Sequence, residues 1–181
     1  MLLTGIDWTL TVLVLAGTAT VSAIGFGRRG AVLPLVAAAL LALGIVLAAI
    51  PAAVAPLPVT ILTAAAALVT AVLGGDPITR LALTRTTFDD EEGTHGGVVD
   101  RASGRELLRG GRVIGLLERL AVAGAIVAGF PEALAVIVAI KGVGRFSELE
   151  NAAVRERFIV GTLASWTWAA TAASVVLLAR T

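Results

Sequence analysis

The chain contains no cysteine and only one histidine among its 181 residues. The absence of cysteine excludes disulfides and thiolate chemistry. His95 has no second histidine or cysteine with which to form a metal site, and we interpret it as a loop residue. Nucleophile-elbow, zincin and P-loop motifs are also missing. We therefore expect no cofactor, no metal and no catalytic residue, and these absences argue against an enzyme without excluding one.

Charge is also scarce. Charged residues make up 15% of the chain and hydrophobic residues 57%, which gives a mean hydropathy of +0.95. Long apolar runs with few charges are typical of helices that cross a membrane. The length corresponds to one domain. The composition therefore predicts an all-α, polytopic transmembrane bundle forming a single domain over residues 1–181.

Six apolar segments have about the length of a membrane span. They cover residues 8–27, 31–50, 57–74, 113–129, 131–145 and 158–179. No Lys or Arg precedes the first segment, so we interpret it as a retained span and not as a cleaved signal peptide. Three spans on each side of a central loop, 75–112, would form a 3+3 arrangement with halves of opposite orientation.

Arginines in the connections define the predicted topology. They follow the first, third and fifth segments, and the other two turns contain none. The positive-inside rule places the basic loops in the cytoplasm and both termini outside. The expected location is the inner (cytoplasmic) membrane.

The central loop has two predicted helix starts. Asp76 fits an N-cap with Pro77 at the first helical position, and Ser103 with Glu106 fits a capping box. Between them lies TTFDDEEGTHGG, whose spacing matches no calcium loop, and which we interpret as a solvated segment.

The fourth and fifth segments carry charges at membrane depth. Helical rise places Glu118 and Lys141 at similar depth in two antiparallel neighbours, so we predict that they approach each other. Arg119 points away from Glu118 and needs another partner. The candidate ligand- or ion-binding residues are Glu118, Arg119, Lys141, Arg145 and Glu148. The alternative is a structural ion-pair cluster in which Arg119 and Arg145 snorkel to the interface.

A basic rim is predicted at the cytoplasmic surface. Its members are Arg105, Arg109, Arg112, Arg155 and Arg157. Such a rim attracts anionic headgroups or phosphate-bearing ligands, although it is equally explained as the positive-inside signal.

Aromatic and small residues indicate how the helices pack. Trp8 suits the outer interface, whereas Trp166 and Trp168 lie well inside the last segment, where at least one should pack internally and find a partner for its indole N–H. Small residues repeat every fourth position in the fourth and last segments and permit close helix contact or a dimer face. They are Ala121, Ala125 and Gly129, then Gly161, Ser165 and Ala169.

The runs RGGRVIGLLERL, PEALAVIVAIKGVGRFSELE and RERFIVGTLASWTWA resemble the C-terminal membrane domain of an uncharacterised family of bacterial integral membrane proteins. The resemblance covers roughly residues 109–169, and it implies no particular reaction. The matched positions are Gly111, Arg112, Gly115, Glu118, Arg119, Glu132, Lys141, Arg145, Phe146, Glu148, Gly161 and Ser165.

The sequence favours binding or transport of a small ion or anionic solute through the intramembrane charges. One alternative is a structural or assembly subunit of a membrane complex. Another is an enzyme that acts on a lipid phosphate at the basic rim. The expected partners are membrane lipids, including anionic ones, and a second copy or another membrane protein, but no nucleic acid.

Overall fold

The computed structural model describes residues 2–28, 30–50, 54–85, 111–144 and 152–180. These residues form six helices and no strand, which confirms the all-α prediction. The helices are α1 (Leu2–Gly25), α2 (Val32–Ala49), α3 (Leu57–Arg85), α4 (Gly111–Val127), α5 (Ala133–Gly144) and α6 (Ala152–Leu178).

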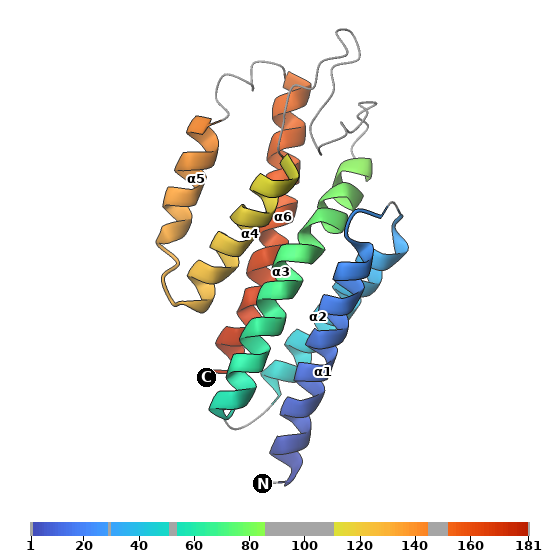
Figure 1. Ribbon diagram of the computed structural model, residues 1–181, viewed down its shortest axis with the longest axis vertical. Coiled ribbons are helices and arrows are strands. Elements are labelled where there is room, and N and C mark those ends of the chain that lie inside the picture. The colour runs from blue at the N-terminus through green and yellow to red at the C-terminus, as the bar shows by residue number, and fades with distance from the viewer. Residues whose placement is uncertain (1, 29, 51–53, 86–110, 145–151, 181) are drawn as a thin grey trace.

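The six helices form an elongated bundle around α3 and α6, which run in opposite directions (Figure 1). Helices α1 and α2 pack on one side of this central pair, and α4 packs on the other. Both termini lie at one end of the bundle, which we call the terminal end. The opposite end carries Arg28, Arg80, Arg112, Arg155 and Arg157, and we call it the basic end.

Four helices, α1, α2, α3 and α6, are long and apolar enough to cross a membrane. The other two are shorter than a full span in the described part of the chain, with 17 residues in α4 and 12 in α5. Helix α5 packs chiefly against α4 and buries none of its residues. Six full spans therefore stay a prediction.

The prediction that Asp76 caps a new helix is wrong. Helix α3 continues to Arg85 with Pro77 in its interior. A proline there lacks the N–H for the i−4 bond, but neighbouring helices can support such a position in an apolar bundle. Gly25 of α1 provides this contact, because a Cβ placed on it would lie 3.7 Å from the Pro77 ring. Asp76 is consequently an interior helical residue.

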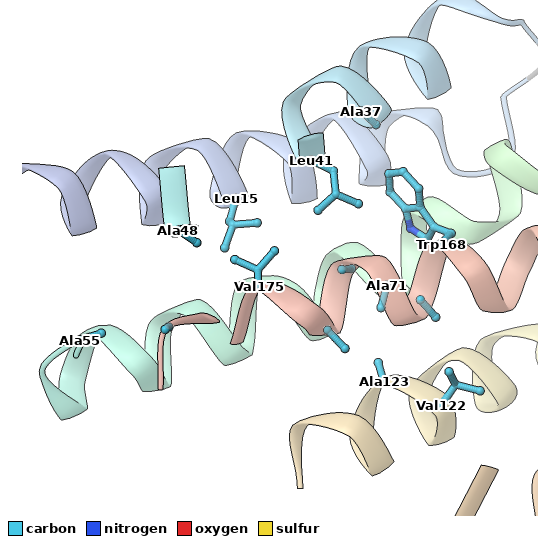
Figure 2. Close-up of a cluster of buried hydrophobic side chains, with 14 of the residues drawn as sticks. Leu15, Ala37, Leu41, Ala48, Ala55, Ala71, Val122, Ala123, Trp168 and Val175 are labelled. Atoms are coloured by element: carbon cyan, nitrogen blue, oxygen red, sulfur yellow. The ribbon is translucent and has the colours of Figure 1, made fainter. Parts of the chain in front are cut away.

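The core is built from small and branched side chains (Figure 2). Leu15 of α1 and Leu41 of α2 face Val175 of α6, while Val122 and Ala123 of α4 close the other side. The stripe Gly161, Ser165 and Ala169 packs inside the chain: Gly161 lies against Thr79 of α3, and Ala169 is fully buried. It is therefore not a free dimer face. On α4, Ala121 and Gly129 are exposed.

Two residues at the terminal end pack against the bundle. Trp8 is 3% exposed, so it packs in the core and not in the interfacial belt that the sequence suggested. Arg180 donates a hydrogen bond from its guanidinium to the carbonyl of Val127 at 2.6 Å. A cation at a helix C-terminus satisfies a free carbonyl and complements the helix dipole. Arg180 therefore caps α4.

Candidate functional site

Glu118 of α4 and Lys141 of α5 form an ion pair, which confirms the prediction that these two residues approach each other. Both side chains are mostly shielded, with 11% and 16% of their surface exposed. The Lys141 ammonium also lies 5.2 Å from the centre of the Phe158 ring of α6, in reach of a cation–π interaction. Lys141 thereby ties the otherwise loosely packed α5 to both α4 and α6.

Arg119 does not snorkel. It is 4% exposed, and its Nε donates to the Val72 carbonyl of α3 at 2.8 Å. One terminal nitrogen donates to the Ser165 hydroxyl of α6 at 3.1 Å. Both acceptors are neutral, so these bonds satisfy two of the five guanidinium N–H donors without cancelling the charge. The buried arginine holds together the three helices that meet at this point.

Glycines make room for the arginine. A Cβ on Gly75 of α3 would lie 2.1 Å from the Arg119 Cδ, and one on Gly115 would lie 3.2 Å from a terminal nitrogen. A real Cβ cannot approach that closely, so the Arg119 side chain crosses α3 only because position 75 has no side chain. The Gly-Gly pair at 74–75 is thus a packing feature, although the sequence suggested the start of a loop.

Asp76 and Arg80 extend the charged site into the first half of the chain. They form an i,i+4 ion pair on α3 at 3.1 Å, with 15% and 18% of their side chains exposed. Asp76 also accepts a 3.4 Å hydrogen bond from the Gly27 amide. Asp76 and Glu118 are the carboxylates whose charges act on Arg119. We call Arg80, Asp76, Arg119, Glu118 and Lys141 the charged network.

The sequence analysis missed Asp76, Arg80 and Ser165 as members of this site. Asp76 was interpreted as the N-cap of a new helix in the connection 75–112, which separated it and Arg80 from the third span, and Ser165 was noted only for its size. A signal was available in the i,i+4 spacing of Asp76 and Arg80, which favours a helical ion pair. No pattern in the sequence indicated that Arg119 would reach α3.

The structure describes three members of the predicted basic rim. Arg112 is exposed and lies 5.9 Å from the centre of the Phe26 ring, Arg155 is exposed, and Arg157 is half-buried. Four predicted members lie outside the described residues: Arg105, Arg109, Arg145 and Glu148. The capping box at Ser103 and the segment TTFDDEEGTHGG lie there too.

Trp168 of α6 makes a second close contact with α3, about one helical turn from Arg119 toward the terminal end. Its indole N–H donates to the Thr70 carbonyl at 2.9 Å, and the ring lies where a Gly74 Cβ would come within 2.5 Å. This confirms that one of the two α6 tryptophans packs internally with a hydrogen-bond partner. Adjacent glycines of α3 thus accommodate Trp168 from α6 and Arg119 from α4.

An apolar pocket of about 450 Å³ opens between α2 and α6, apart from the charged network. Its lining includes Leu41, Ile45, Ile78 and Trp168, and it contains no charged side chain. A groove of this kind suits a hydrocarbon chain better than an ion. We therefore place the candidate site at the charged network.

Within the described residues, no three His, Asp or Glu side chains are grouped so that they could hold a metal ion. No family model, curated protein or solved structure matches the chain. The candidate site accordingly rests on the side-chain geometry alone, and the family resemblance stays a prediction.

Proposed function

We propose that this protein is a bacterial inner-membrane protein that binds a small anion or anionic solute at the charged network and moves it across the membrane. Four apolar helices are compatible with a membrane location. The basic end would face the cytoplasm by the positive-inside rule, and both termini would face outward. Helices α4 and α5 would complete a 3+3 arrangement with the charged network between the halves.

The observation that carries the proposal is the burial of the Arg119 charge. Arg119 is 4% exposed, and its two hydrogen-bond acceptors, the Val72 carbonyl and the Ser165 hydroxyl, are both neutral. A buried positive charge at apolar depth costs several kcal/mol unless a counter-charge or water compensates it. An anion bound beside Arg119 or Lys141 would supply that counter-charge.

The geometry suggests different roles for the two central cations. Arg119 is fixed by Val72 and Ser165, so it contributes a positive potential without needing to move. Lys141 is held by Glu118 and lies on the least buried helix, so an arriving anion would compete with Glu118 for the ammonium. Glu118 would thus set how tightly the anion is held.

Binding can be tested by native mass spectrometry of protein extracted gently from its own membrane. We expect a retained small anion or phosphate-bearing lipid that is lost in Lys141→Ala and kept in Arg28→Gln. Arg28 is an exposed arginine at the basic end outside the network, so this control removes the same charge from the same end. Free anion and lipid are distinguished by mass.

Transport can be tested by reconstituting the protein in vesicles loaded with the anion identified in that way. Glu118→Gln should change the transport rate, because the Lys141 ammonium loses its carboxylate competitor. An unchanged rate would show that Glu118 has no part in transport. Anion binding that survives both Lys141→Ala and Arg119→Ala would place the site elsewhere.

A structural or assembly role is the second candidate, and the exposure of α5 favours it. Val136, Ile140 and Val143 are each at least 60% exposed, and α5 touches little beyond α4. In this case the Glu118–Lys141 pair would fix the position of α5 for a protein partner. Stable co-purification of one partner at fixed stoichiometry, lost in Ile140→Lys, would support this role over transport.

A further inference from the structure

Buried hydroxyl groups form a column through the half of the bundle away from α4 and α5. Each is at most 1% exposed. The members are Thr11, Thr18 and Ser22 of α1, with Thr63 and Thr70 of α3. We call them the hydroxyl column. Helices α1 and α3 pack against each other and run in the same direction (Figure 1).

The register of the two helices places these hydroxyls in matching layers. Gly25 lies against Pro77, which fixes the depth of α1 relative to α3. Thr11 precedes Thr63, and Thr18 precedes Thr70, by the same number of positions as Gly25 precedes Pro77. The two layers are about 10 Å apart at 1.5 Å per residue. Each layer therefore contributes a hydroxyl from both helices.

Several of these polar groups have no hydrogen-bond partner. The hydroxyls of Ser22, Thr63 and Thr70 are unpaired, and so is the indole N–H of buried Trp8 near the terminal end. Thr18 within the column, and Thr20 and Thr171 outside it, donate to a carbonyl of their own helix. That bond is the usual way to satisfy a helical threonine in an apolar environment. The unpaired hydroxyls of Ser22, Thr63 and Thr70 depart from this pattern and destabilise the fold.

The column covers most of the membrane and ends at the charged network. Trp8 and Ser22 are about 21 Å apart along α1, against about 30 Å for the hydrocarbon core. The Gly25–Pro77 contact places Ser22 at the depth of Gly74, one residue before the glycine that Arg119 crosses. Asp76 lies two residues further along α3 and accepts a hydrogen bond from the Gly27 amide, just after the end of α1.

We propose that the hydroxyl column is the route by which a small, singly charged anion passes between the terminal end and the charged network. Neutral O–H and N–H donors can replace part of an anion's hydration without binding it too tightly to leave. The column is closed to solvent, so passage requires α1 and α3 to separate. This inference rests on the proposed anion-binding function and adds the route and the size and charge of the solute.

The route can be tested with the full chain in proteoliposomes, with chloride, nitrate and formate as the three probes. Thr63→Val and Thr70→Val keep the side-chain shape and remove the hydroxyl. Thr20→Val is the matched control, because Thr20 is exposed and satisfied by the Ala16 carbonyl. Anion efflux and the thermal unfolding midpoint are measured for each variant.

The column variants should lower efflux roughly tenfold, the factor that corresponds to one hydrogen bond. They should also raise the unfolding midpoint, because an unpaired buried donor is removed. The control should leave efflux unchanged. Chloride binding at the charged network should survive in all three variants.

Normal efflux in both column variants, with efflux lost in Lys141→Ala, would place the route elsewhere and leave the proposed function intact. A lowered midpoint with normal efflux would show instead that the hydroxyls hold α1 and α3 together. A wild-type protein that neither binds nor conducts any of the three anions would overturn the route and the proposed function together.

Discussion

Replacing Gly75 by alanine tests the placement of Arg119 most directly. The new Cβ would lie 2.1 Å from the Arg119 Cδ and 2.6 Å from its Nε, so the middle of the side chain, and not only its tip, must move. Such a shift breaks the bonds to the Val72 carbonyl and the Ser165 hydroxyl.

The expected cost follows from those two bonds. A hydrogen bond to a charged group contributes about 1.5–3 kcal/mol, so losing both costs roughly 3–6 kcal/mol. Alanine recovers about 1 kcal/mol through its higher helix propensity. The free energy of unfolding should therefore fall by about 2–5 kcal/mol. Gly17→Ala is the matched control, because a Cβ there meets nothing within 4 Å, and it should leave stability unchanged or slightly raised.

Reversible unfolding in mixed micelles, followed by circular dichroism, gives the free energies. The double variant Gly75→Ala with Arg119→Ala makes the test specific, because the clash disappears when the arginine is absent. The two substitutions should be strongly non-additive. Equal costs of Gly75→Ala with and without Arg119, or a Gly75→Ala protein as stable as Gly17→Ala, would refute the packing of Arg119 on α3.

Two further predictions concern contacts on either side of the site. Trp168→Phe removes the hydrogen bond to the Thr70 carbonyl and should lower the free energy of unfolding by about 1 kcal/mol. In Gly74→Ala the new Cβ would lie 2.5 Å from the indole ring, so this variant should lower the free energy of unfolding further and shift the tryptophan emission. A smaller effect for Gly74→Ala than for Trp168→Phe in the same unfolding assay would contradict the close approach. Arg180→Gln frees the Val127 carbonyl and should speed amide exchange in the last turn of α4 without changing exchange in α1. Unchanged exchange at α4 would show that Arg180 does not cap that helix.

The helical class, the four long apolar helices and the Glu118–Lys141 pair could be predicted from the sequence. Apolar runs specify helices that cross a membrane wherever they fold, because each backbone polar group must be paired within the helix. Helical rise fixes depth, and two helices joined by a tight turn must be neighbours. For this reason the Glu118–Lys141 pair was predictable before any tertiary contact was known.

Only the tertiary structure decided the surroundings of Arg119. Depth says nothing about which helix lies on a given face, and α3 and α4 are separated by a long connection in the sequence. Packing brings Gly75 and Ser165 to the two sides of Arg119, so the alternative in which this residue snorkels to the interface is wrong. In the folded bundle α3 also continues through Pro77, whose ring lies beside Gly25 of α1. Local preferences set the helices and their depth, whereas the contacts between helices assembled the charged network.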